Sequence, residues 1–285
     1  MGALRRRMEE ELKLRGMSEK TAVAYLGTVR RFTAYHGRSP DRLGAEEVRA
    51  YLLHLIEERK LAWSSVNQAL CALRFFYLDV LGHSFEQVDL PYQKRKQRLP
   101  VVLTEVEVAR LLQAPMSLKL RTVLMTLYSA GLRLGEATHL RPTDIDSGAM
   151  AIRIRQGKGG RDRMVVLSAH LLSTLRQYWR VYRPGAWLFY GNSKDKPIDA
   201  RTVQRTVQAA ARAVGIRKQV TPHTLRHTCA THLMESGTSL RYIQELLGHR
   251  SLKTTQIYTQ VRPGRVTGLL SPLDRLGLEA PQYSD

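Results

Sequence analysis

Two short stretches decide the fold class of this chain of 285 residues. Residues 151–155 read Ala-Ile-Arg-Ile-Arg, and residues 164–167 read Met-Val-Val-Leu. The first alternates apolar and polar side chains, which is typical of a half-buried strand, and the second has the composition of a partner strand. Between them, residues 156–162 read Gln-Gly-Lys-Gly-Gly-Arg-Asp, a glycine-rich turn. We therefore expect a β-hairpin here and a further short strand at 187–189.

Helical patterns surround this hairpin. Thr104 and Glu107 form a capping-box pattern that starts a helix, and another helix is expected over residues 118–129. From Ser168 onward the chain is again mostly helical. The predicted fold class is therefore mainly α with a small β-sheet (α+β).

The N-terminal part follows helical periodicity alone. Apolar residues recur at helical spacing within residues 4–15, after the N-cap residue Ser18, after Gly44, and from residues 64–65 onward. Four short amphipathic helices predict a small bundle whose apolar stripes form its core.

A basic stretch separates the two parts. Residues 90–100 read Leu-Pro-Tyr-Gln-Lys-Arg-Lys-Gln-Arg-Leu-Pro, and prolines bracket the charges of Lys94, Arg95, Lys96 and Arg98. This composition predicts a linker. Its charges could form a solvated run or, if the protein binds nucleic acid, lie along the phosphate backbone, and both interpretations stay open. We expect a domain at 1–89, a basic linker at 90–103 and a second domain, with a tail, at 104–285.

The charge of the whole chain points to a polyanionic partner. Lys and Arg number 45 against 25 Asp and Glu, a formal net charge of +20. Nucleic acid is the expected ligand, because each neutralised phosphate releases a counterion. No run of about 18 apolar residues predicts a membrane span. Cys71 and Cys229 show no zinc-site spacing and are expected to be small buried hydrophobes.

Four segments of the second domain carry side chains suited to phosphate chemistry. They are residues 130–136 (Ala-Gly-Leu-Arg-Leu-Gly-Glu), the hairpin turn, residues 221–227 (Thr-Pro-His-Thr-Leu-Arg-His), and residues 246–258 with Leu-Gly-His at 247–249 and a final tyrosine. A phosphodiester under attack accumulates negative charge, and guanidinium groups stabilise that charge without losing their proton. Arg133 and Arg226 suit this role.

A zinc site is the alternative for one of these segments. His223 and His227 stand four positions apart, a spacing that can bind zinc on a helix. The glutamate of an HExxH pattern is missing, and Arg226 between the two histidines would repel a cation. We expect no metal here. Pro222 suits the first turn of a helix, on which His223 and Arg226 would point the same way.

In this order the segments resemble the tyrosine recombinases, the phage integrase family that includes Xer-type recombinases and transposon-type integrases. The residues that match the family's catalytic pattern are Arg133 with the supporting Glu136, Lys158, His223, Arg226, His249 and Tyr258. The resemblance covers nearly the whole chain. It implies an N-terminal helical, SAM-like core-binding domain that contacts DNA, and a C-terminal integrase-type catalytic domain. The position two after Tyr258, often His in Xer-type proteins, is Gln260, and we expect little effect from it.

The resemblance also implies an activity: cleavage and rejoining of DNA strands through a 3′-phosphotyrosyl link at Tyr258, without metal, ATP or another cofactor. A phenol needs activation because its reference pKa is about 10. His223 is expected to accept its proton, and Lys158 to protonate the leaving 5′ oxygen. His249 would hydrogen-bond the phosphate or the tyrosine region, and Glu136 would orient an arginine.

The expected partner is double-stranded DNA, bound by a homotetramer on paired sites, with no membrane and a cytoplasmic, nucleoid-associated location. Two other functions stay open: a DNA-relaxing enzyme similar to type IB topoisomerases, and a non-catalytic DNA-binding regulator. The tail after Pro263 has two equally good interpretations. It could dock on a neighbouring subunit, or it could cap its own domain.

Overall fold

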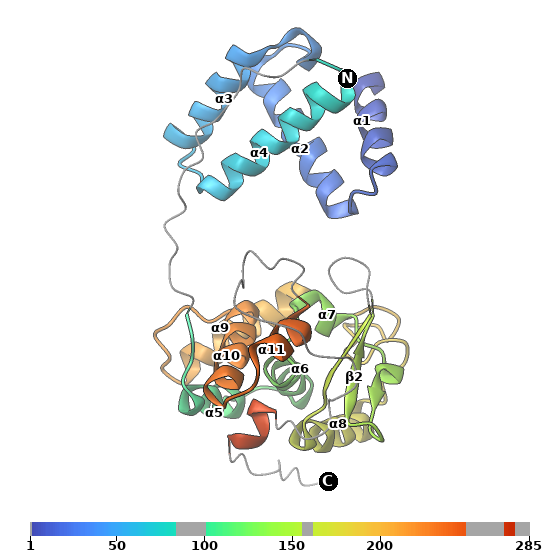
Figure 1. The fold of residues 1–285 in the computed structure, drawn as a ribbon, viewed down its shortest axis with the longest axis vertical. Coiled ribbons are helices and arrows are strands. Elements are labelled where there is room, and N and C mark those ends of the chain that lie inside the picture. The colour runs from blue at the N-terminus through green and yellow to red at the C-terminus, as the bar shows by residue number, and fades with distance from the viewer. Residues whose placement is uncertain (1, 84–100, 156–161, 249–270, 277–285) are drawn as a thin grey trace. The chain divides into compact units, whose positions relative to one another are not determined.

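Helices dominate both parts of the chain in the computed structural model, which describes residues 2–83, 101–155, 162–248 and 271–276 (Figure 1). The chain divides into two units, Met1–Gln97 and Arg98–Asp285. The predicted fold class, mainly α with a small antiparallel sheet, is confirmed.

The first unit is a bundle with the predicted helices. It contains α1 (Gly2–Leu14), α2 (Glu19–His36), the 3₁₀ turn η1 (Pro40–Arg42), α3 (Ala45–Glu57), α4 (Trp63–Phe75) and the π-helical turn η2 (Phe76–Val80). The Ser18 side chain accepts a hydrogen bond from the Thr21 backbone N–H and so begins α2 as expected. Phe32, Val48 and Leu73 are fully buried in the shared core of the bundle.

The second unit is larger and carries the sheet. Its helices are α5 (Glu105–Gln113), α6 (Leu118–Ser129), α7 (Leu134–Thr138), α8 (Ala169–Tyr182), α9 (Ala200–Ala213), α10 (Pro222–Glu235) and α11 (Leu240–Leu247), with the 3₁₀ turns η3 (Pro142–Asp144) and η5 (Pro272–Arg275). The capping box of Thr104 and Glu107 begins α5, and α6 has the predicted bounds.

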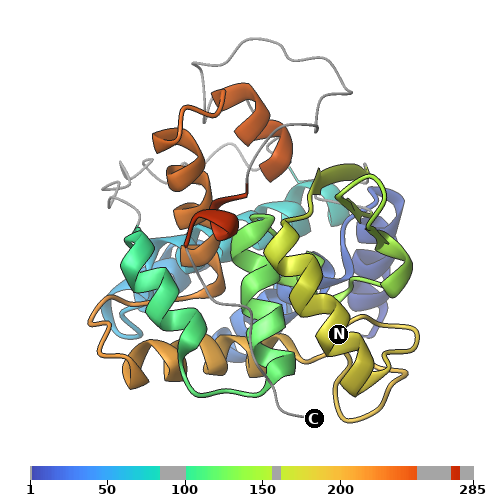
Figure 2. The same ribbon diagram turned by 90° about the horizontal axis from the view of Figure 1, so that it is seen from below.

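Helix α6 is the centre of this unit, and α5, α8, α9, α10 and η5 pack against it (Figure 2). Every residue from Thr122 to Ser129 is buried. Thr122 and Thr126 lie inside an apolar core, and each hydroxyl donates to the carbonyl four residues earlier, at 2.7 Å. These local hydrogen bonds satisfy the polar groups without breaking the helix.

The sheet has three strands in the order β1 (Ile145–Asp146), β2 (Ala151–Ile154) and β3 (Arg163–Val166), all antiparallel. The predicted hairpin is present as β2 and β3, with Ile154 paired to Arg163. Strand β1 is an addition that the sequence pattern did not predict, since two residues are too few to show alternation.

The residues before α5 and the described part of the tail both belong to the second unit. Leu103, the last residue of the predicted linker, is buried, and its carbonyl accepts a hydrogen bond from His232 Nε2 at 2.9 Å. Leu273 in η5 is 1% exposed, a burial that contributes roughly 2 kcal/mol. Asp274 in η5 accepts from the His170 backbone N–H at 3.0 Å. Residues 271–276 therefore cap their own unit.

Two expectations are wrong. Residues 187–189 form no strand; instead the Leu188 N–H donates to the Leu140 carbonyl, and an isolated bridge joins Tyr190 to Pro197. Cys71 is exposed, because it lies on the outer face of α4, whereas Cys229 is buried as expected. Periodicity places a residue on a helix face only to within one position, and a small cysteine gives no signal of its own.

Among the described residues, no helix combines the length and the apolar character needed to cross a bilayer.

Candidate active site

The turn between α6 and α7 presents Arg133 and Glu136. Gly131 in this turn has a φ of +57°, and a Cβ there would lie 3.1 Å from Leu246 Cδ2 and 3.3 Å from Cys229 Sγ. Glycine alone tolerates this combination of left-handed backbone and close packing without strain. The turn thus sets Arg133 as the N-cap of α7, with Glu136 three residues later.

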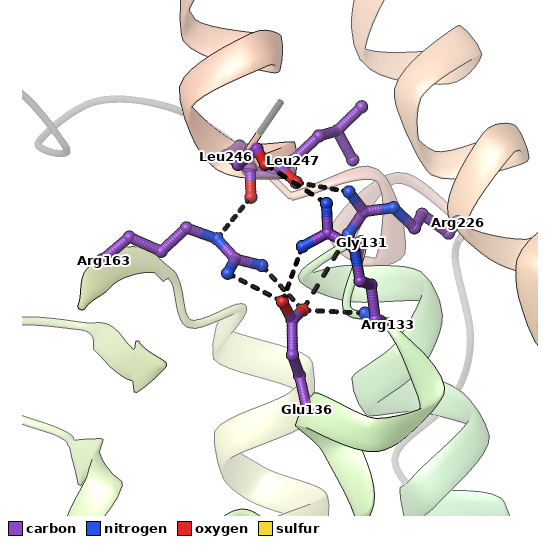
Figure 3. A network of polar contacts seen from close by, with 8 residues as sticks. Gly131, Arg133, Glu136, Arg163, Arg226, Leu246 and Leu247 are labelled. Atoms are coloured by element: carbon purple, nitrogen blue, oxygen red, sulfur yellow. Dashed lines mark hydrogen bonds and ion pairs between the residues drawn. The ribbon is translucent and has the colours of Figure 1, made fainter. Parts of the chain in front are cut away.

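Three arginines surround the Glu136 carboxylate (Figure 3). Arg133 donates from its backbone N–H to Oε2 and from Nη1 to Oε1, both at 2.8 Å. Arg163 binds both oxygens in a fork, with Nη1 2.9 Å from Oε1 and Nη2 2.7 Å from Oε2. Arg226 Nη1 is 3.9 Å from Oε2, which makes an ion pair beyond hydrogen-bond distance. Residues from α7, β3 and α10 therefore meet at one carboxylate.

The same arginines also hold the C-terminal end of α11. Arg163 Nε donates to the Leu246 carbonyl at 2.9 Å, Arg226 Nη2 to the Leu247 carbonyl, and Arg133 Nη2 to the Gly248 carbonyl at 3.2 Å (Figure 3). The last carbonyls of a helix have no partner within the helix and carry its negative dipole end. Three guanidinium groups satisfy three successive carbonyls.

This cluster holds more positive than negative charge. Three arginines face one glutamate, which leaves a formal excess of two positive charges. The Arg226 side chain is 3% exposed and that of Arg163 12% exposed, so water screens little of this charge. A cationic cluster of this kind, with two of its three arginines nearly buried, favours an anion.

The pKa values follow from burial and from these neighbours. Burial alone would raise the pKa of Glu136, but hydrogen bonds from Arg163 and from the Arg133 backbone outweigh it and lower the pKa to about 2. Burial, together with repulsion from Arg133, lowers the pKa of Arg226 to about 10. At neutral pH the glutamate is therefore ionised and Arg226 is protonated.

His223 lies on the first turn of α10, three residues before Arg226. Thr221 caps this helix. Pro222 occupies its first position, as predicted. Burial, His227 and the two arginines Arg226 and Arg133 all lower the pKa of His223. The rings of His223 and His227 meet edge to face, with their centroids 4.4 Å apart. His223 is therefore a neutral imidazole at neutral pH, in a state that can accept a proton.

The structure brings together Arg133, Glu136 and Arg226, which the sequence placed in one site. The positive charges of the two arginines contribute to the lowered pKa of His223. The other predicted site residues lie outside the described residues: the catalytic candidates Lys158, His249 and Tyr258, and the linker residues Lys94, Arg95, Lys96 and Arg98. The catalytic roles remain predictions.

Arg163 is a member of the cluster that the sequence did not indicate. It is the first residue of β3, where an arginine after a basic turn looks like one more surface charge. Nothing local marks it as buried, because its partners Glu136 and Leu246 lie 27 and 83 positions away. Pairing of β2 with β3 puts it at the end of the hairpin, but only the packing of α7 and α11 turns it into a site residue.

The sequence matches the phage integrase family over residues 101–265, and the SAM-like N-terminal domain of phage integrases over residues 4–87. The chain belongs to the phage integrase family. A Sinorhizobium fredii protein, y4qK, whose name places it among the integrases and recombinases, is 43% identical over 99% of this chain and 92% of its own length. A tyrosine recombinase XerC of Pelobacter propionicus is 37% identical over 93% of this chain and 91% of its own.

A solved structure shares the fold at lower identity. The λ integrase tetramer bound to a Holliday junction aligns with a TM-score of 0.69 and 20% identity, over 92% of this chain and 80% of that chain. The predicted family and its two-part architecture, a helical N-terminal domain followed by an integrase-type catalytic domain, are thus confirmed.

Proposed function

We propose that this phage integrase family member is a site-specific DNA recombinase that cleaves and rejoins strands through a 3′-phosphotyrosyl intermediate at Tyr258. The observation that carries the proposal is the cluster of Arg133, Arg163 and Arg226 on one buried glutamate, with its excess of positive charge. A scissile phosphate that gains negative charge during attack would be stabilised there, because the cationic groups are desolvated and already positioned.

Each proton transfer is assigned to a group that can accept or donate that proton. Tyr258 Oη attacks the phosphorus, its proton passes to the neutral His223, and the bond from phosphorus to the 5′ oxygen breaks. Lys158 protonates that oxygen, which leaves as a 5′-hydroxyl. Resealing reverses these steps with a 5′-hydroxyl from another strand, so the energy of the broken bond is kept in the phosphotyrosyl link. His249 would hydrogen-bond the phosphate.

Duplex DNA is the proposed substrate. The net charge of +20 favours a polyanion, and residues 1–89 with the basic linker would bind the duplex together with the catalytic domain. Recombination joins two duplexes, so the working assembly would be a homotetramer on paired sites. The λ integrase that shares this fold forms a tetramer on a Holliday junction.

The test is covalent trapping on a library of nicked suicide duplexes, in which the released 5′-hydroxyl fragment diffuses away and prevents resealing. We expect an adduct that survives denaturation, and sequencing of the attached ends would give the target site. Tyr258→Phe should abolish the adduct, whereas Tyr182→Phe, a matched loss of one phenol hydroxyl on α8, should retain it. An adduct that persists in Tyr258→Phe would overturn the proposal.

A plasmid assay distinguishes the relaxing enzyme from the recombinase. A supercoiled plasmid without the trapped site should stay supercoiled, and a pair of plasmids with that site should recombine. Relaxation of the first plasmid without recombination of the second would favour an activity of the topoisomerase IB type.

A further inference from the structure

Arg163, which is not among the catalytic residues predicted above, donates to the cluster from every side-chain nitrogen. Its guanidinium donates from Nη1 and Nη2 to the two oxygens of Glu136, and from Nε to the Leu246 carbonyl. All three nitrogens therefore donate to protein groups of α7 and α11. A guanidinium so committed is suited to holding other residues in place.

Arg133 and Arg226 differ from it in how they meet the carboxylate. Arg133 reaches Glu136 with one side-chain nitrogen, and Arg226 only with an ion pair of 3.9 Å. Each also donates to a carbonyl at the end of α11. Arg163 is therefore the arginine of this cluster whose side chain binds both oxygens of Glu136.

Arg163 also connects elements that are far apart in the sequence. It begins β3, its backbone pairs with Ile154 on β2, and its side chain spans to α7 and to the last turn of α11. Gly248, the C-cap of α11, lies directly against the guanidinium, since a Cβ there would be 3.5 Å from Arg163 Cζ. The side chain thus fixes where the chain leaves α11, ten positions before Tyr258 in the sequence.

We propose that Arg163 is a positioning residue for strand cleavage. It holds the Glu136 carboxylate and the end of α11, so that Arg133 and Arg226 meet the scissile phosphate with the required geometry. The inference rests on the proposed function. It adds a residue from outside the catalytic set and assigns it no contact with DNA.

The decisive variant is Arg163→Lys. Lysine keeps the charge but cannot bind a carboxylate in a fork and reach a carbonyl as well. At saturating protein on the trapped duplex, we expect the rate of covalent attachment to fall by about 10²-fold, since a displacement of about 1 Å costs that much. The dissociation constant for DNA should stay within about twofold of the wild-type value, because lysine keeps the single positive charge of the arginine that it replaces.

The matched control is Arg153→Lys. Arg153 also pairs with a carboxylate, that of Asp162, but its side chain is 54% exposed on β2. We expect attachment at the wild-type rate. Arg163→Gln serves as a second variant, and its rate of covalent attachment should be lower than that of Arg163→Lys. Circular dichroism shows whether each variant folds. If Arg163→Gln does not fold, the result for Arg163→Lys decides.

A double-mutant cycle tests whether Arg163 acts through Glu136. If it does, Arg163→Lys combined with Glu136→Gln should be about as slow as the slower single variant. The inference would be overturned if the rate loss of the double variant equalled the product of the two single losses. It would also be overturned if Arg163→Lys cleaved at the wild-type rate. Both outcomes presuppose an adduct that depends on Tyr258, so they differ from a failure of the proposed function, in which no such adduct forms.

Discussion

The second unit contains arginine–carboxylate pairs in two settings. Beside the sheet, Arg153 pairs with Asp162 at 2.8 Å, one cation for one anion, and both side chains are about half exposed. In the cluster around Glu136, three arginines share one carboxylate, and two of the three are nearly buried. The residue types are the same, but the balance of charge and the access of water differ.

Charge balance and access of water distinguish an ion pair that only supports the structure from a cluster that can bind a ligand. A neutral, solvated pair contributes little to stability and attracts no ligand. A desolvated cluster with an excess of two positive charges is costly without an anion, and under the proposed function the scissile phosphate would offset that cost.

The largest effect is expected at the most buried arginine. Arg226→Lys replaces a fork that donates to the carbonyls of Gly131 and Leu247 with a single ammonium. We expect the single-turnover rate of covalent attachment to fall by about 10²- to 10³-fold, as for loss of one group that stabilises transition-state charge. A rate within threefold of wild type would show that the buried setting of Arg226 has no catalytic consequence.

The next effect concerns stability as a function of pH. The pKa of Glu136 is lowered to about 2, so its ionised form stabilises the fold above the unfolded-state value, and that contribution disappears as the pH falls toward 2. Glu136→Gln should lower the free energy of unfolding by roughly 3 kcal/mol at pH 7, because three arginines lose their counterion. Urea unfolding of both proteins should show the gap closing between about pH 4.5 and pH 2; a gap that does not change with pH would contradict the assignment.

A smaller effect is a shift in the pH dependence of cleavage. The pKa of His223 is lowered from its ordinary value of 6.5 by burial, by His227 and by the arginines. As the proton acceptor it is active when neutral, so the rate should hold through neutral pH and fall only on the acid side of pH 6.5. His227→Gln removes one cause of the lowering and should move this acid limb upward. If the acid limb does not move in His227→Gln, His227 does not influence the pKa of the proton acceptor.

The smallest effect belongs to the exposed pair. Asp162→Asn removes the partner of Arg153, whose side chain is 54% exposed. We expect the free energy of unfolding to change by no more than about 0.5 kcal/mol, and the effect to shrink further in salt. A loss as large as that in Glu136→Gln, measured by the same urea titration, would remove the distinction between the two settings.

Sequence patterns predicted much of this architecture because the signals are local. The cap at Ser18, the capping box at Thr104 and the proline at 222 lie within a few residues of the backbone groups that they serve. The hairpin followed from alternation in residues 151–155. The prediction of a strand at residues 187–189 was wrong, because their backbone hydrogen-bonds to Leu140 and to Tyr178 of α8. Periodicity does not distinguish such contacts from strand pairing.

The candidate site divides in the same way. Arg133, Glu136, His223 and Arg226 could be named from the order and spacing of their motifs, and the convergence of Arg133, Glu136 and Arg226 agrees with that order. Arg163 could not be named, because an arginine at a strand end has the same local pattern whether it points to water or to a buried carboxylate.

The sequence by itself therefore determined the fold class, the family and the identities of the expected catalytic residues, since these depend on short-range periodicity and ordered motifs. Only the tertiary structure decided that one carboxylate serves three arginines, that three carbonyls of α11 complete their contacts, and that η5 caps its own unit. The reason is physical: burial and charge balance arise from groups that can be 115 or more positions apart, which no local pattern relates.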